Sequence, residues 1–303
     1  MIQFDYNFAK VKGNIYSNQR NHQAELVLSK ENKKAKIDGK DVLKISEYVG
    51  YLNVVVFVPD DLSLVKGSPS TRRKFIDLEL SKISPIYAFY LAKYNRLLKE
   101  RNQYLKLLSK KNGKYDDYLE TIDEQMVDVQ LKVIEKRENF IERLSKNVKD
   151  VYKSIADNEE YVDLHYLCFI KKKDKEELLK LYKKEFSRDL KYLSTTHGIH
   201  KEDMKIMIDR KSAHQYASQG QQRTIVLSIK IALLELIKEE IGEYPILLLD
   251  DVLSELDDQR KTKLLDILNN RIQTFITTTS IDGIEHHVIK EAKKININRK
   301  EKQ

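Results

Sequence analysis

The apolar run Pro245–Leu249, which ends in two adjacent aspartates, limits the possible folds more than any other stretch. A wholly apolar run of this length is typical of a strand buried on both faces of a parallel sheet. Asp250 and Asp251 follow at its carboxyl end, where open α/β sheets place ligands. Neighbouring carboxylates repel each other unless a cation or a proton separates them. Mg²⁺ held together with a phosphate explains the pair most simply; a solvated loop is the alternative.

The residues before this strand predict a long, largely buried helix. Ser218 is a favourable N-cap residue, and Gln221 three positions later completes a capping-box pattern. From Ile225 onwards, apolar residues cover most of the helical surface. The free N–H groups of the first turn and Gly220 would suit an anion, because a helix N-terminus carries partial positive charge. An ordinary cap on a core helix is the alternative.

Composition favours a cytoplasmic protein with a polyanionic partner. The 55 lysines and arginines exceed the 47 aspartates and glutamates, giving a net charge of +8, although lysine-rich chains without such a partner also reach this excess. The single cysteine, Cys168, excludes an internal disulfide and fits a reducing compartment. No apolar run approaches the roughly 20 residues of a membrane span, so no membrane contact is expected.

The rest of the chain divides into a β-rich start and a helical middle. The first sixty residues predict a mostly antiparallel β-layer, with an alternating strand from Ile2 to Phe8, a hairpin turn at Asp38-Gly39 and a buried strand at Asn53–Val58. Helical periodicity predicts two long helices, at 86–108 and about 119–155, that form an antiparallel arm. His197 and His200 would suit a metal only with a third ligand, and none is suitably spaced.

Several stretches resemble the ABC-type ATPases of the SMC and RecF class. ASQGQQR at 217–223 resembles their signature motif, and ILLLDDVLSELD at 246–257 resembles their Walker B strand followed by the D-loop. The wording is most similar to the RecF family, as are VVVFVPDDLSLVKGSPSTRRKFIDLELSKISPIY at 54–87 and QTFITTTS at 273–280. The resemblance covers about residues 50 to 280.

This resemblance implies an α/β fold with two parts. An ABC-type ATPase head, a mixed β-sheet with flanking helices, would comprise residues 1–60 and 195–303. A helical lobe with a short antiparallel arm would comprise residues 61–194.

The resemblance also implies roles for individual residues. Asp250 would hold Mg²⁺, and Asp251 would be the catalytic carboxylate that polarises the attacking water. The signature residues Ser218, Gly220 and Gln221 would contact the γ-phosphate of ATP bound by the other protomer of a dimer. Ser254 and Asp257 match the D-loop, which crosses the dimer interface, and the switch position falls near Thr279.

The implied function is that of a DNA repair and recombination mediator. Such a protein dimerises on ATP, binds DNA at single-strand gaps and assists recombinase loading together with other mediator proteins. No helix-turn-helix or zinc motif is evident, so contact with single-stranded and duplex DNA is expected to be sequence-independent. The basic cluster Lys66, Arg72 and Arg73 is the candidate surface, with a solvated loop as the alternative.

One motif of the family is missing. The 303 residues contain no G-x-x-x-x-G-K-[ST] loop, which supplies most phosphate contacts in such ATPases. We therefore expect an N-terminally truncated RecF-type chain in which the family's weak, DNA-stimulated ATPase activity is absent from the chain alone. The alternative is a non-catalytic interaction protein that offers its signature face or its helical arm to a complete ATPase.

Overall fold

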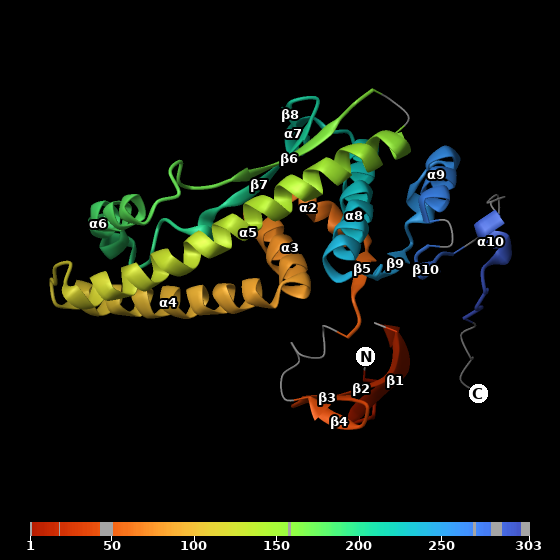
Figure 1. The fold of residues 1–303 in the computed structure, drawn as a ribbon, viewed down its shortest axis with the longest axis horizontal. Helices are drawn as coiled ribbons and strands as arrows, with labels where there is room; N and C mark the ends of the chain where they lie inside the picture. The colour runs from red at the N-terminus through yellow and green to blue at the C-terminus, as the bar shows by residue number, and fades with distance from the viewer. Residues whose placement is uncertain are drawn as a thin grey trace.

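The computed structural model describes residues 2–17, 19–42, 51–156, 159–268, 271–279 and 287–297. Within these ranges the protein is α/β and combines small sheets with long helices (Figure 1). No helix among them is long and apolar enough to cross a membrane.

An antiparallel sheet opens the chain. Its order is β1 (Phe8–Ser17), β2 (Arg20–Ser29), β3 (Lys33–Ile37) and β4 (Lys40–Val42). Asp38 and Gly39 have φ values of 50° and 78°, so the predicted hairpin turn is confirmed. The predicted strand Ile2–Phe8 is wrong, because β1 only begins at Phe8 and the side chains of Phe4 and Tyr6 are 94% and 59% exposed. Residues 43–50, within the predicted β-layer, lie outside the described residues.

A parallel sheet holds the strand that ends in the two aspartates. Its order is β10 (Thr274–Thr277), β9 (Ile246–Asp250) and β5 (Val54–Phe57). The buried strand β9 is therefore confirmed in the central position. The prediction that 53–58 belongs to the antiparallel layer is wrong, because β5 pairs with β9, nearly 200 residues later in the chain.

Helices form the arm expected from periodicity. The chain passes through η1 (Pro59–Leu62), α2 (Ser63–Lys66) and α3 (Pro69–Ile83) into α4 (Pro85–Lys110) and α5 (Asp117–Ala156). In Figure 1, α4 runs beneath the outer part of α5, and the described turn between them includes Asn112 at φ 49°. The apolar seam of α5 is buried, which confirms that it serves internal packing.

A third sheet connects the arm to the rest of the chain. Its strands β6 (Val162–Leu167), β7 (Asp203–Ile208) and β8 (Lys211–Ser212) are antiparallel. Between β6 and β7 lie α6 (Lys175–Tyr192) and η2 (Ile199–Lys201). Since β6 and β7 fall on opposite sides of residue 195, this sheet joins the two parts of the chain expected from the resemblance.

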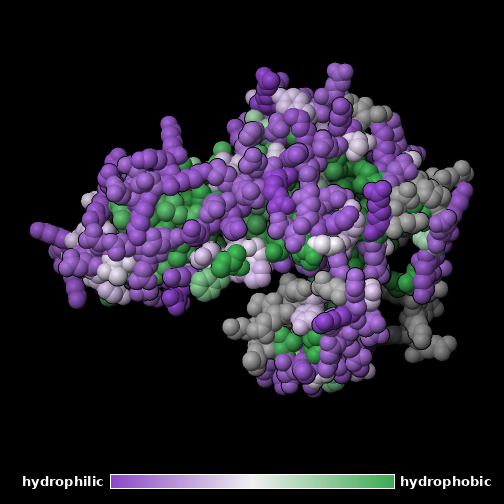
Figure 2. All heavy atoms as spheres, in the orientation of Figure 1, coloured by the Kyte–Doolittle hydropathy of each residue, from purple (hydrophilic) through white to green (hydrophobic). Residues whose placement is uncertain are grey.

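Helix α8 (Gln219–Ile241) is the centre of the core. It follows α7 (Ala213–Tyr216), and nearly all its apolar residues from Ile225 to Ile237 are buried. They belong to one hydrophobic cluster that also includes residues of β5, β9, α3 and α5. The face seen in Figure 2 is mostly hydrophilic, with smaller apolar patches over the arm, the central part and the N-terminal sheet. The described chain continues through η3 (Leu253–Glu255), α9 (Asp258–Leu268) and α10 (His287–Glu291).

Candidate functional site

Asp250 and Asp251 lie where β9 ends, as the sequence predicts. The hydroxyl of Thr277, on the neighbouring strand β10, donates to Oδ1 of Asp250 over 2.5 Å. The N–H of Asp251 donates to the carbonyl and to Oγ1 of Thr277, over 3.2 and 3.1 Å. Asp251 has a φ of 53°, a left-handed conformation that aspartate tolerates. The chain thus turns sharply out of the sheet immediately after Asp250.

One oxygen of Asp251 is buried without a hydrogen-bond partner. Among the described residues, Oδ1 of Asp251 is one of few buried side-chain oxygens left unpaired, an arrangement that is costly unless a ligand satisfies it. No cluster of three or more potential metal ligands occurs in the described part of the chain. The aspartate pair and Thr277 nevertheless fit Mg²⁺, which takes one or two carboxylates and completes its shell with water and substrate phosphates.

Thr277 is a site residue that the sequence reasoning missed. The predicted switch residue, Thr279, lies two positions beyond the end of β10 and is exposed. Thr277 pairs in register with Asp250. The parallel pairing of the two strands could have identified it, but only once the register was known.

The D-loop residues stabilise the turn that follows. Oγ of Ser254 donates to the carbonyl of Asp251 over 2.8 Å. Asp257 is the N-cap of α9, because its Oδ1 accepts the N–H of Arg260 over 2.9 Å, and its Oδ2 lies 3.4 Å from Nε of Arg260. Both predicted residues therefore hold the segment between β9 and α9 in shape.

The start of α8 has the predicted capping box. Oγ of Ser218 accepts the N–H of Gln221, and Oε1 of Gln221 accepts the N–H of Ser218. Nε2 of Gln221 donates to Glu160 over 2.7 Å, and the hydroxyl of Tyr152 donates to the same carboxylate over 2.9 Å. Burial and the bond to Glu160 raise the pKa of Tyr152, so this hydroxyl stays protonated.

Gly220 brings the signature helix close to the helix that follows the D-loop. A Cβ atom at Gly220 would lie 3.4 Å from Nη1 of Arg260, so the guanidinium of Arg260 lies next to the start of α8. Among the described residues, the side chains of Ser218 and Gln221 bond to each other and to Glu160, and neither bonds to Asp250 or Asp251. The capping box and the carboxylate pair are thus held by different hydrogen bonds.

The three predicted DNA-binding cations do not form one exposed cluster. Arg72 is 9% exposed, and its nitrogens donate to both carboxylate oxygens of Asp203 and to the carbonyl of Gly67. Arg73 donates one bond, from Nη1 to the carbonyl of Glu202 over 2.7 Å, and is only partly buried. Lys66 is exposed at the end of α2. Arg72 is therefore a structural residue and has no free nitrogen for a phosphate.

His200 has a structural role as well. Its Nδ1 lies 2.7 Å from the hydroxyl of Tyr94, and its Nε2 lies 3.0 Å from the carbonyl of Thr195. Burial lowers its pKa to about 4, so the ring is neutral at physiological pH. His197 and His200 belong to no group of potential metal ligands among the described residues.

A parallel sheet that ends in paired aspartates, next to a capped helix carrying the signature sequence, defines an ABC-type ATPase head. Comparison with known proteins identifies the family within this class. The chain is 42% identical to a DNA replication and repair protein RecF of Staphylococcus carnosus, covering 99% of this chain and 83% of that protein. Proteins of the same name from a Geobacillus species and from Staphylococcus aureus are 42% and 40% identical. The chain belongs to the RecF family of DNA replication and repair proteins.

Solved structures agree with this assignment. Two structures of the recombination mediator protein RecF in the RecFOR pathway, one with ATP and one with ATPrS, are 35% identical to this chain. Both cover 92% of this chain and 77% of the solved chain, with TM-scores of 0.84 and 0.82. No model of a protein family matches the chain.

Proposed function

We propose that this protein is an ATP-dependent recombination mediator that dimerises on DNA at single-strand gaps and assists recombinase loading with other mediator proteins. The observation that carries the proposal is the buried, unpartnered oxygen of Asp251 beside Asp250 at the end of β9. Family membership and the similarity to a RecF–ATP structure support ATP as the nucleotide.

In this proposal Asp250, aligned by Thr277, and the adjacent Asp251 face the triphosphate. Bound Mg²⁺ would neutralise phosphate charge there, with Asp250 as its protein ligand. Asp251 would accept a hydrogen bond from the attacking water and orient it towards the γ-phosphate. Its unpaired oxygen is suited to that task, because no described side chain competes for it.

The second half of the site would come from another protomer. Ser218, Gly220 and Gln221 would contact the γ-phosphate of ATP bound by the partner, and Ser254 and Asp257 would lie at the interface, with Thr279 as the switch. Within the described part of one chain, the side chains of Ser218 and Gln221 bond to each other and to Glu160, which supports this division. The head at 1–60 and 195–303 and the helical lobe at 61–194 would form each protomer.

DNA contact is proposed for Lys66 and Arg73, through backbone phosphates and without sequence preference. Arg72 is left out, because Asp203 already occupies its guanidinium. The protein would act in the cytoplasm, where its DNA substrate lies.

A non-catalytic role is the second candidate, and one observation favours it. The 303 residues lack a G-x-x-x-x-G-K-[ST] loop, without which the phosphates are not positioned for Asp251. Such a protein would present its signature surface or its helical arm to a complete ATPase.

Hydrolysis by a P-loop fusion tests the proposal. In this fusion, a designed strand–G-x-x-x-x-G-K-[ST]–helix segment precedes residue 1. We expect slow, DNA-stimulated ATP hydrolysis that Asp251→Asn abolishes while ATP stays bound, and negligible hydrolysis by the 303-residue chain alone. A fusion that binds ATP but hydrolyses it equally well with Asp251→Asn would refute the role of Asp251. Strong hydrolysis by the chain alone would refute the need for the loop.

A further inference from the structure

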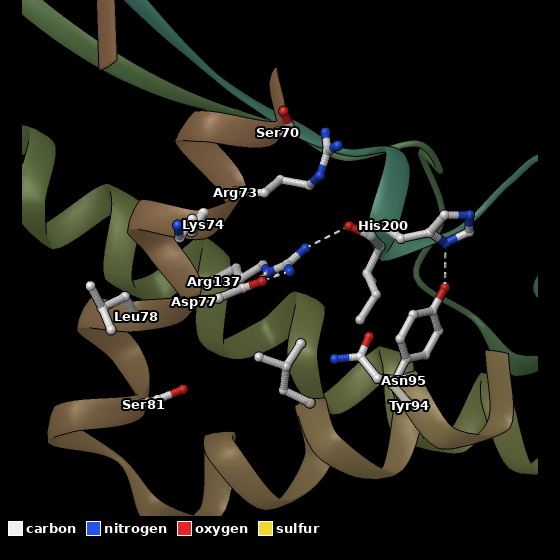
Figure 3. A pocket seen from close by; sticks show the side chains of 12 residues that line it. Ser70, Arg73, Lys74, Asp77, Leu78, Ser81, Tyr94, Asn95, Arg137 and His200 are labelled. Carbon is white, nitrogen blue, oxygen red and sulfur yellow. Dashed lines mark hydrogen bonds and ion pairs between the residues drawn. The ribbon is translucent and has the colours of Figure 1, made fainter. Parts of the chain in front are cut away.

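A cavity of about 480 Å³ opens between α3, α4 and η2, lined by residues other than those of the nucleotide site. Figure 3 shows Arg73, Lys74, Leu78 and Ser81 along α3, with Tyr94 and Asn95 on α4. The volume lies within the range of sites for small molecules, about 300–1,000 Å³.

Two cations make the cavity electropositive. Lys74 is exposed and forms no ion pair in the described part of the chain, and Arg73 uses one nitrogen on the carbonyl of Glu202. Asp77 is the one acidic residue among those that line the cavity. Its Oδ1 is already held by Nη2 of the buried Arg137 over 2.7 Å, so its charge is compensated. Arg73 and Lys74 are therefore available to an anion.

The same cavity has an apolar wall with polar groups beside it. Leu78 is 53% exposed, and the half-buried Leu91 also lines the space. Asn95, which is exposed, and Ser81 add neutral donors and acceptors. A ligand that fits must combine an anionic group with a flat or apolar body.

We infer that this cavity receives one unpaired nucleotide of a DNA strand. Its phosphate would lie against Arg73 and Lys74, and its base against Leu78 and Leu91 with an edge towards Asn95. A paired base is stacked inside a duplex and cannot enter such a cavity, whereas an unstacked base can be accommodated beside a basic groove. The inference rests on the proposed DNA-binding function and adds a preference for unpaired nucleotides.

Binding of labelled DNA tests the inference. The full chain is titrated against a 20-nucleotide oligo-dT strand and a duplex of the same length, with fluorescence anisotropy at several salt concentrations. One lost phosphate contact lowers the affinity for a single strand about fourfold at 0.15 M salt. It also reduces the slope of log affinity against log salt concentration by about 0.7. We expect such a loss on Lys74→Ala. Lys191→Ala, on the exposed face of α6, removes the same charge outside the cavity and should have little effect.

The apolar wall is tested by a matched pair of leucines. Leu78 and Leu107 are both 53% exposed, and Leu107 does not line the cavity. We expect Leu78→Ser to weaken single-strand binding several-fold more than duplex binding, and Leu107→Ser to change neither. Photo-crosslinking of an oligo-dT containing 4-thiothymidine should label residues 70–95, and Leu78→Ser should reduce that label.

Each other outcome overturns the inference in a distinct way. If Lys74→Ala weakens both DNAs equally and Leu78→Ser has no effect, the cavity contacts backbone without admitting a nucleotide. If DNA binding is unchanged while a labelled hexaglutamate peptide loses affinity on Lys74→Ala, the cavity takes an acidic protein segment. If the unmodified chain binds no DNA, the proposed function itself fails; if it binds DNA and all variants match it, only this inference fails.

Discussion

Thr277 and Asp250 join the ends of two parallel strands, since the threonine hydroxyl donates to Oδ1 of the aspartate over 2.5 Å. The same Oγ1 accepts the N–H of Asp251 over 3.1 Å, so one side chain positions both carboxylate-bearing residues. A hydroxyl at this position therefore matters for the geometry of the site as well as for the sheet.

Replacing Thr277 with valine should weaken both the geometry of the site and the stability of the sheet. Thr277→Val keeps the shape but removes both hydrogen bonds, so we expect a loss of about 1–2 kcal/mol in the free energy of unfolding, measured in urea. In the P-loop fusion it should also lower the rate of ATP hydrolysis. Thr277→Ser restores the hydroxyl and should recover most of the unfolding free energy and most of the rate of ATP hydrolysis. Thr279→Val is the control for stability alone, and an equal loss of unfolding free energy at Thr279 would contradict the assignment.

Arg101 should be the most costly charged residue to remove from the arm. It is fully buried and donates to Asp123 on α5, to Asp189 on α6 and to Thr195. Arg101→Ala would leave two buried carboxylates without their partner, which costs about 3–5 kcal/mol. Arg143→Ala removes an exposed arginine paired with Glu239 and Glu240 and should cost under about 1 kcal/mol. If Arg101→Ala and Arg143→Ala lost similar amounts of unfolding free energy in urea, the buried network would have no special structural role.

His200 should make the protein lose stability as the pH falls. Burial lowers its pKa to about 4, below the ordinary value of 6.5, so folding favours the neutral ring. Its stabilising contribution is complete above pH 6.5 and is lost as the pH falls towards 4, by at most about 1.4 kcal/mol per unit. His200→Gln should therefore flatten the decline of the unfolding free energy between pH 7 and 5. The exposed His214→Gln should leave it unchanged, and equal slopes in all three proteins would contradict this account.

Local patterns predicted the local features of this fold well. The capped start of α8, the buried strand β9 and the apolar seam of α5 all depend on short-range periodicity and side-chain size, which the sequence displays directly. The alternating pattern from Ile2 to Phe8 gave a wrong prediction. It has the spacing of a half-buried strand, but its apolar side chains do not pack against a core.

Contacts between residues far apart in the chain could not be predicted from the sequence. Arg72 reads as a surface cation in a basic cluster, yet its partner Asp203 lies 131 residues later. The strand at 54–57 gave no indication that it pairs with β9, and the buried triad of Arg101, Asp123 and Asp189 is spread over three helices. Such contacts depend on tertiary geometry, so neither the burial of Arg72 nor the contacts of Thr277 could be assigned before the structure.

Two lysines should protect the edge of β5, which is an outer strand of its sheet in the described part of the chain. The carbonyl of Asn53 accepts the N–H of Ile246 from β9, so the alternate carbonyls of Val54 and Val56 face away from the sheet. Nζ of Lys82 donates to the carbonyl of Val54 over 3.2 Å, and Nζ of Lys230 donates to the carbonyl of Val56 over 2.8 Å. Charged side chains on an edge prevent pairing with other chains.

Lys230→Met tests this protection. It leaves the Val56 carbonyl and the carboxylate of Asp61 without their partner, so we expect a loss of about 2–4 kcal/mol in unfolding free energy. The double variant with Lys82→Met should also scatter more light at micromolar concentration, because the edge is then open. Lys238→Met, on the same helix as Lys230, is the control. A double variant that stays monodisperse would show that the edge needs no such protection.

Ser218 should prove to have two separable roles. As a helix cap it accepts the N–H of Gln221, so Ser218→Ala should cost about 1 kcal/mol in unfolding free energy and Ser218→Asn much less. As a proposed contact to the partner's nucleotide, it should tolerate no bulk or added charge.

Ser218→Arg in the P-loop fusion isolates the second role. The arginine would fill the space next to the partner's γ-phosphate, while the nucleotide pocket of the same chain is untouched. We expect ATP binding to be retained and the ATP-dependent dimer to be lost in sedimentation velocity. Gln215→Arg adds the same side chain at an exposed position of α7 three residues away and should still dimerise. If Ser218→Arg also dimerised normally on ATP, the serine would serve only as a cap, and the signature surface would have to meet its partner elsewhere.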